Sequence, residues 1–253
     1  MPKAVVTDGY SIDRHIPLYL RDAFYKSPYP EYTYVTTNGY GPYDFSTQGL
    51  VLYLPLWALK GSAFKSVDDY KHTCSVQGAL WTTNGRSFDN IDEKITIPDA
   101  PSLQISGDMS FIAWVNQTGV RSAGYERTIL TKRDAGGINY VSQLSATTNY
   151  MSWSDGVAGF TGTQALTTAT WYHIATTVSD GTLNGVIHYI DLAAEVTAGT
   201  PTVTVDDAPL DIGTMYLDDR YGWYGLIGEI WLYNRVLSLA ELTINRNATA
   251  WRY

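Results

Sequence analysis

Aromatic and charged side chains are concentrated in the segment MYLDDRYGWYG, residues 215–225, and these residue types suit sugar recognition. Aromatic rings can stack on the C–H faces of a sugar, while carboxylate and guanidinium groups can bind its hydroxyl groups. The same residue types are enriched in protein interfaces, so the segment could instead contact another subunit. The candidate sugar-binding or interface residues are Tyr216, Asp218, Asp219, Arg220, Tyr221, Trp223 and Tyr224. A second candidate site, in the segment NYMSWSDG, comprises Tyr150, Trp153 and Asp155.

The acidic residues do not have the spacing that cleavage of a glycosidic bond requires. A retaining mechanism needs two carboxyl groups roughly 5–5.5 Å apart, which two acidic residues at alternate positions of one strand would provide. Adjacent residues of a strand point to opposite faces. The acidic pairs of this sequence are adjacent, namely Asp68-Asp69, Asp92-Glu93, Asp206-Asp207 and Asp218-Asp219. The four histidines show no metal or triad spacing, so the sequence predicts no catalytic residues and no enzymatic activity.

The charge and composition exclude several classes of protein. Lys and Arg number 17 and Asp and Glu number 25, which gives a net charge of −8 without a basic cluster, so nucleic acid is not an expected partner. No stretch of 18 apolar residues occurs, so we expect no membrane insertion. The first 20 residues show no signal peptide, and the protein is expected in the cytoplasm, or at a virion or extracellular surface after assembly or lysis. The single cysteine, Cys74, cannot form an internal disulfide.

Residues 1–48 differ in composition from the rest of the chain. Eight of the 20 tyrosines and five of the ten prolines lie there, without sustained alternation of apolar and polar residues. Apolar residues at helical spacing predict a helix over roughly 17–26, and the remainder is expected to be extended because residues before proline avoid the α region. We interpret residues 1–48 as an arm that docks onto a partner or a sister copy. The candidate docking residues are Phe24, Tyr25, Tyr29, Tyr32, Tyr34, Tyr40 and Tyr43.

From Leu50 onward, short apolar runs alternate with turn signals such as Asn84-Gly85, as in an antiparallel sheet. The clearest predicted strands are 50–56, 94–98, 109–116, 128–132, 140–145, 171–178, 185–191 and 226–234. The run 109–116 places Phe111 on one face and Trp114 on the other, so this strand has one clearly apolar face and one amphipathic, aromatic face.

One helix is predicted in this region. Ser238 and Glu241 have the spacing of a capping box, which predicts a short C-terminal helix over roughly 239–246. Many short strands without alternating helices favour an all-β fold, a two-sheet antiparallel jelly-roll sandwich, with the arm before it and this helix at its end. We divide the chain into the arm, 1–48, and a jelly-roll domain, 49–253.

The order of these segments resembles the laminin-G-like, concanavalin A-like jelly-roll domains, in particular those of prokaryotic and virus-associated hypothetical proteins. The resemblance covers about residues 50–247 and leaves the arm outside. The segments that carry it are Gly49–Leu56, Gly78–Trp81, Ser87–Asp92, Ile95–Pro98, Ser110–Val115, Ile129–Lys132, Trp171–Ala175 and Gly225–Ser238. This fold is shared by lectins, adhesins and glycoside hydrolases. The resemblance therefore implies a specific fold but leaves several functions open.

The resemblance also implies a candidate calcium site, since similar domains often hold one Ca²⁺ at the rim. The matching positions are Asp89 and Asp92, with Glu229 from the last strand, and calcium prefers such oxygen ligands. The sequence departs from the pattern at Gly228, where many relatives have Asp, which removes one ligand. In the alternative reading, Asp89 and Asp92 cap turns.

Two functional hypotheses follow. The first is a non-catalytic structural or adhesion protein, such as a virion or surface decoration subunit, that forms a homo-oligomer or larger assembly through its arm. The alternative is a carbohydrate-binding, lectin-like module that uses the loops at the rim. A glycoside hydrolase ranks third because no carboxylate pair has the required spacing.

Overall fold

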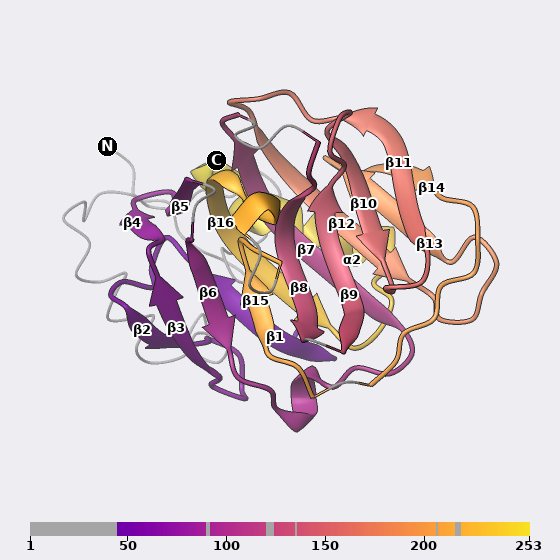
Figure 1. Cartoon of the computed structure of the whole chain (residues 1–253), viewed down its shortest axis with the longest axis horizontal. Helices are drawn as coiled ribbons and strands as arrows, with labels where there is room; N and C mark the ends of the chain where they lie inside the picture. Colours follow the sequence, from indigo (N-terminus) through magenta and orange to yellow (C-terminus); the bar gives the residue numbers. More distant parts are fainter. Residues whose placement is uncertain (1–44, 90–91, 120–123, 135, 206, 216–218) are drawn as a thin grey trace, which may run out of the picture.

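The protein is represented by a computed structural model, which describes residues 45–89, 92–119, 124–134, 136–205, 207–215 and 219–253 (Figure 1). Its strands are β1 (Leu50–Pro55), β2 (Ala63–Lys65), β3 (Thr73–Gln77), β4 (Leu80–Thr82), β5 (Gly85–Asp89), β6 (Lys94–Ile97), β7 (Met109–Gln117), β8 (Arg127–Asp134), β9 (Gly137–Leu144), β10 (Tyr150–Ser154), β11 (Gly159–Ala165), β12 (Trp171–Val178), β13 (Val186–Ile190), β14 (Ala193–Val196), β15 (Leu210–Ile212) and β16 (Tyr224–Tyr233). Its helices are the 3-10 helices η2 (Pro101–Leu103), η3 (Asp219–Tyr221) and η4 (Ala250–Arg252), and the α-helix α2 (Leu239–Thr249).

The strands form two antiparallel sheets that pack face to face. Sheet A has the order β14-β13-β12-β7-β16-β5-β4, with β1 also paired to β16, and sheet B has the order β11-β10-β9-β8-β15-β6-β3-β2. This is the predicted all-β jelly-roll sandwich. The predicted turn at Asn84-Gly85 joins β4 to β5, whose register pairs Thr82 with Gly85. In the described part of the chain, no helix is long and apolar enough to cross a membrane.

Alternation along β7 explains why both faces of sheet A are apolar. Phe111 and Val115 enter the inner core, which lies between the two sheets, whereas Ile112 and Trp114 enter a second cluster on the outer face. The predicted separation of Phe111 from Trp114 is therefore confirmed, and the face that carries Trp114 is also buried. The outer cluster consists of Phe45, Leu50, Tyr53, Val67, Ile112, Trp114, Ala175, Tyr189, Trp231, Tyr233, Leu237 and Leu242.

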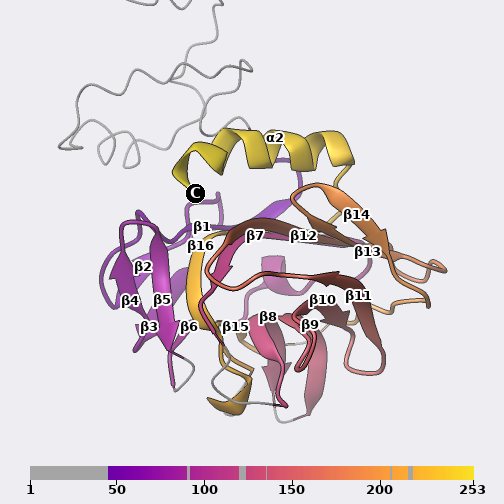
Figure 2. The same ribbon diagram turned by 90° about the horizontal axis from the view of Figure 1, so that it is seen from above.

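Helix α2 covers the outer face of sheet A (Figure 2). It begins with the predicted capping box, in which Ser238 Oγ accepts from Glu241 N and Glu241 Oε2 accepts from Ser238 N. Its last residue, Thr249, accepts a 2.8 Å hydrogen bond from Trp114 Nε1, and Leu242 packs in the outer cluster. The helix extends three residues beyond the predicted end at 246, because those extra residues still contact the sheet.

The end of the predicted arm is attached to the same face. Phe45 lies edge-on to the rings of Tyr53, at 4.8 Å, and Trp231, at 5.8 Å. Tyr233 Oη donates to Ser46 O at 3.0 Å, and Arg235 Nε donates to Gln48 O at 2.8 Å. The predicted helix 17–26 and all the candidate docking residues, Phe24 to Tyr43, lie outside the described residues.

Candidate functional site

The candidate loop 215–225 meets a second loop at one end of sheet B. Strand β15 pairs antiparallel with β8, so the end of β15 adjoins the start of β8, and Gly213 N donates to Ile129 O at 3.0 Å. The segment that follows β15 contains η3, and the segment that precedes β8 contains Tyr125. The topology therefore brings these two connections together although they are far apart in the sequence.

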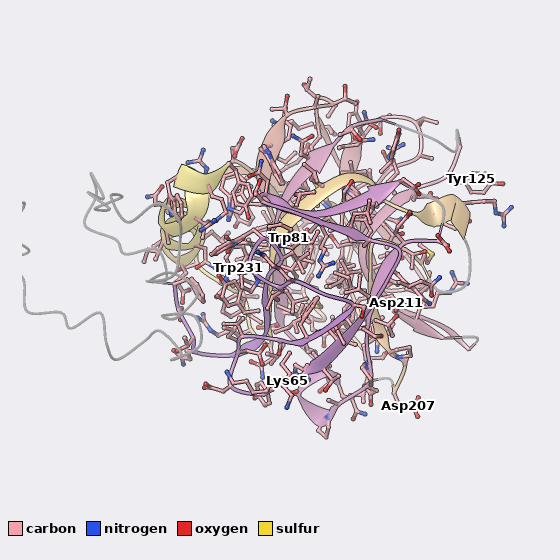
Figure 3. All side chains as sticks on the ribbon, turned by 90° about the vertical axis from the view of Figure 1, so that its left-hand side faces the viewer. Lys65, Trp81, Tyr125, Asp207, Asp211 and Trp231 are labelled. Carbon is pink, nitrogen blue, oxygen red and sulfur yellow. The ribbon has the colours of Figure 1, made fainter. Side chains whose placement is uncertain are left out.

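Three side chains form a cluster there, which we call the rim cluster: Tyr125, Arg220 and Tyr221. Arg220 Nη1 donates to Tyr125 Oη at 3.0 Å, and its guanidinium lies 4.8 Å from the centre of the Tyr125 ring. The rings of Tyr125 and Tyr221 are 5.4 Å apart and nearly perpendicular. Arg220 is exposed and both tyrosines are half-buried, so a ligand can reach all three. Figure 3 shows Tyr125 projecting from the molecule.

The outer face of sheet B beside the rim cluster is polar. Asp211 lies between Leu210 and Ile212, which both enter the inner core, so its side chain points outward. It is opposite Thr96 on one side and Thr131 on the other, and Thr96 Oγ1 donates to Asp211 Oδ1 at 2.5 Å. Burial raises the pKa of the Asp211 carboxyl above its usual value, against the effect of that hydrogen bond.

Several polar atoms on this face lack hydrogen bonds. Thr128 on β8 is opposite Gln143 on β9, and both point outward with Thr131. Thr128 Oγ1, Thr131 Oγ1 and Gln143 Oε1 are buried without a hydrogen-bond partner among the described residues. Buried polar atoms without a partner are uncommon and often mark places where water or a ligand supplies the missing hydrogen bond. We call Thr96, Thr128, Thr131, Gln143 and Asp211 the polar face.

The remaining predicted residues of the loop occupy different environments. The prediction that Trp223 is a rim residue is wrong, because its side chain is fully buried in the inner core and its backbone N–H donates to Gly213 O at 2.7 Å. Tyr224 is half-buried at the start of β16. Asp219 begins η3, and its side chain is outside what the structure describes, as are Tyr216 and Asp218 entirely.

The second predicted site is also wrong as a ligand site. The Trp153 side chain is 1% exposed and packs in the inner core, 5.6 Å from the Phe160 ring. Asp155 is buried and caps the β10–β11 turn, because its Oδ1 accepts from the backbone of Val157 and Ala158 at 2.9 and 2.7 Å. Of this trio, Tyr150 alone is half-buried at the surface.

The three carboxylates of the predicted calcium site do not lie together. Asp89 is opposite Tyr224 in the register of β5 and β16, and Glu229 is five residues further along β16, which is about 16 Å at 3.3 Å per residue. Asp89 and Asp92 are exposed, whereas Glu229 is enclosed. Among the described residues, no three His, Cys, Asp or Glu side chains are grouped to hold a metal ion. Glu229 therefore does not belong to a calcium site with Asp89 and Asp92, and calcium binding by these two aspartates stays a prediction.

Glu229 is instead the centre of a hydrogen-bond network on the outer face of sheet A. Its carboxylate accepts from Tyr53 Oη at 3.0 Å, Trp57 Nε1 at 2.9 Å and Tyr253 Oη at 3.3 Å. Arg252 Nε lies 3.5 Å from the same carboxylate. Burial raises the pKa of Glu229 to about 7, although Arg252 and the hydrogen bonds lower it in part. With 1% of its surface exposed, Glu229 holds the last residues of the chain rather than a ligand.

The structure shows what occupies the space beside Gly228, the position at which many of the resembling domains have Asp. A β-carbon added at Gly228 would overlap the ring and hydroxyl of Tyr253. The Tyr253 ring also stacks on Trp114, with 4.7 Å between ring centres. The absent Asp side chain thus leaves the space in which Tyr253 packs.

Comparison with known families is consistent with this architecture. The family model described as the concanavalin A-like lectin/glucanases superfamily matches residues 88–243, more than half of the chain. No curated protein sequence matches the chain.

Among solved structures, a Trypanosoma rangeli sialidase in complex with sialic acid has a TM-score of 0.62 and 17% identity, over 80% of this chain and 33% of the sialidase. The chain therefore spans about a third of that enzyme. Domain 4 of AbnA, an extracellular arabinanase from Geobacillus stearothermophilus in complex with arabinotriose, has a TM-score of 0.60 and 17% identity, over 79% of this chain and 98% of that domain. The binding domain of Paraclostridial Mosquitocidal Protein 1 has a TM-score of 0.55 and 13% identity, over 80% of this chain and 52% of that chain. At these identities the likeness shows the shared fold.

Proposed function

Because the chain belongs to the concanavalin A-like lectin/glucanases superfamily, we propose that it binds carbohydrate through the rim cluster, without catalysis of its own. Two of the structurally similar proteins were solved with sugars, sialic acid in the sialidase and arabinotriose in the arabinanase domain, which supports this class of ligand.

The observation that carries the proposal is the fixed geometry of the rim cluster. The hydrogen bond and the ring contact to Tyr125 hold the Arg220 guanidinium in place, with Tyr221 beside it. Two accessible rings offer stacking surfaces for sugar C–H groups, and the guanidinium offers donors to hydroxyl or carboxylate groups. Because these groups are already positioned, binding loses less side-chain entropy.

The polar face takes no direct part in the proposed site. Oxygen atoms of Thr128, Thr131 and Gln143 lack partners within the described residues, but each of these atoms is buried, so a ligand at the surface does not contact them. Ordered water is the group that can complete their hydrogen bonds.

A glycan array of neutral and acidic oligosaccharides tests the proposal on the full chain. We expect the wild-type protein to bind at least one glycan, and the double variant Tyr125→Ala, Tyr221→Ala to lose that signal while its melting temperature stays unchanged. Unaltered binding by the double variant would remove the rim cluster from the site.

A second function, assembly into a virion or surface structure, is favoured by one observation. Phe45, Ser46 and Gln48 attach the end of the arm to the outer face of sheet A. The tyrosine-rich segment before them therefore starts from a defined point, from which it can reach a partner or a sister copy. The oligomeric mass of the full chain, measured by light scattering across a concentration series, tests this role, and a monomer at every concentration would argue against self-assembly.

A further inference from the structure

Half-exposed tryptophans from three separate chain segments gather at the edge of sheet A, away from the rim cluster. Trp57 follows β1, Trp81 lies on the edge strand β4, and Trp251 lies in η4. Trp81 Nε1 donates to Trp57 O at 2.8 Å, which ties two of the segments together. Trp251 is 47% exposed, and Leu80, which precedes Trp81 in the chain, is 70% exposed. In Figure 3, Trp81 lies between α2 and Tyr125, and Tyr125 projects at the edge farthest from α2.

Two cations accompany these rings. Lys60 Nζ lies 4.2 Å from the centre of the Trp81 ring, and the Arg252 guanidinium lies 3.3 Å from Trp57 and 4.1 Å from Trp251. Arg252 also lies 3.5 Å from the Glu229 carboxylate, so Lys60 is the exposed cation of this surface that can pair with a further acidic group. We call Trp57, Lys60, Trp81, Trp251 and Arg252 the tryptophan patch.

The tryptophan patch is continuous with the place where the arm joins the domain. Phe45 packs against Tyr53, whose hydroxyl donates to one oxygen of Glu229, and Trp57 donates to the other oxygen. A single carboxylate therefore separates the start of the arm from the first tryptophan of the patch.

We propose that the segment Ser27–Tyr34 of the arm, SPYPEYTY, docks on the tryptophan patch of its own chain. The inference goes beyond the proposed binding of carbohydrate, because it concerns the edge of sheet A rather than the rim cluster at the end of sheet B. In this arrangement the segment is bound to its own domain, and a partner that binds the same segment would have to displace it from the tryptophan patch.

The chemistry of the segment matches that of the patch. Pro28 and Pro30 favour an extended backbone, and such proline-containing segments bind surfaces lined with aromatic rings. The tyrosine rings add apolar area at a small entropy cost. Glu31 is the single charge within the segment, and it is opposite in sign to Lys60.

The arm is long enough, and its attachment favours its own domain over another copy. Ten residues lie between Tyr34 and Phe45, and the eleven extended steps from one to the other span roughly 36 Å. Because the segment and the patch belong to one chain, their effective concentration is on the order of millimolar, which exceeds the protein concentration of dilute solutions.

Limited digestion of the full chain by chymotrypsin, followed by mass spectrometry, measures cleavage after Tyr32 and Tyr34. We expect Trp81→Ala to accelerate this cleavage on the order of tenfold, because a central aromatic anchor is removed. Trp81→Phe, which keeps a ring, should remain close to the wild type and controls for damage to β4. Tyr221→Ala, at the rim cluster, should leave the cleavage rate unchanged.

A charge exchange provides the second test. Lys60→Glu should accelerate cleavage roughly two- to fivefold, as expected for one exposed ion pair, and Glu31→Lys introduced together with Lys60→Glu should restore the wild-type rate. Equal cleavage of the wild type and Trp81→Ala would overturn the proposal. Protection that increases with protein concentration, together with a dimeric mass, would overturn docking within one chain.

Discussion

Arg220 donates a 3.0 Å hydrogen bond to the hydroxyl of Tyr125, although 95 positions separate the two residues in the sequence. They meet because β15 and β8 are neighbours in sheet B, so that the segments flanking these strands share one end of the sheet. The contact fixes a guanidinium against a half-exposed ring. The proposed carbohydrate site therefore depends on two connections, the one after β15 and the one before β8. The connection before β8, which contains Tyr125, has no unusual residue composition.

Substitution of Arg220 should weaken glycan binding without unfolding the protein. We expect Arg220→Ala to reduce the affinity roughly fivefold to tenfold, and Arg220→Lys to recover a part of it, because lysine lacks the planar fork of donors. Since Arg220 is exposed, the free energy of unfolding should change by less than about 0.5 kcal/mol. Calorimetric titration and thermal melting measure the two quantities. A Lys variant that binds as tightly as the wild type would contradict a role for the guanidinium geometry.

Trp223→Ala should behave as a core mutation. The side chain is fully buried in the inner core, and removing a buried tryptophan costs roughly 3–5 kcal/mol. Chemical denaturation should therefore show a large loss of stability, whereas Tyr221→Ala in the same loop should show little. A stable Trp223→Ala variant with selectively lost glycan binding would instead support the sequence-based prediction.

Gly228→Ala should destabilise the attachment of Tyr253. The added β-carbon overlaps the ring and hydroxyl of Tyr253, so one of them must move, at a cost of roughly 1–3 kcal/mol. Gly159→Ala is the matched control, since nothing lies within 4 Å of a β-carbon added at that strand position. Equal melting temperatures of the two variants would show that Tyr253 does not need this space.

Glu229 should make stability fall as the pH rises toward neutral. Burial raises its pKa from an ordinary 4.5 to about 7, so the folded protein binds more protons than the unfolded chain between these values. The contribution of Glu229 to the free energy of unfolding is fully present below pH 4.5 and is lost as the pH rises to 7. The change over this range is about 3 kcal/mol. His173, whose pKa burial lowers to about 3, acts in the opposite direction below its ordinary 6.5.

A comparison of the wild type with Glu229→Gln separates the two groups, because His173 is present in both proteins. The stability of the variant relative to the wild type should increase from pH 4.5 to pH 7 and then stay constant. Denaturation curves at several pH values measure this difference. A difference that does not depend on pH would show that the pKa of Glu229 in the folded protein is not raised above its ordinary value.

Local patterns in the sequence were sufficient to predict most of the fold. Alternation in 109–116 separated Phe111 from Trp114 correctly, because the side chains of a strand must point to opposite faces. The capping box predicted the start of α2, since its hydrogen bonds join residues three apart. Both features depend on neighbours in the chain.

The site was harder to predict because exposure and proximity depend on residues distant in sequence. Trp223 and Tyr221 are equally aromatic and two positions apart, yet only Trp223 enters the core. The family resemblance groups Glu229 with Asp89 and Asp92 in one calcium site, whereas the register of β16 places Glu229 five residues from the position opposite Asp89. Tyr125 is not among the predicted site residues, and its one signal in the sequence is an aromatic residue three positions before the predicted strand 128–132.

The most direct test of the central claim is glycan binding by the full chain, first on an array and then by titration calorimetry with the strongest ligand. We expect saturable binding that Tyr221→Ala weakens on the order of tenfold, with an unchanged melting temperature. Tyr70→Ala, which removes a 54% exposed ring on the β2–β3 connection, should bind as the wild type does. Absence of binding to every glycan, or equal affinity in Tyr221→Ala and Tyr70→Ala, would contradict carbohydrate recognition at the rim cluster.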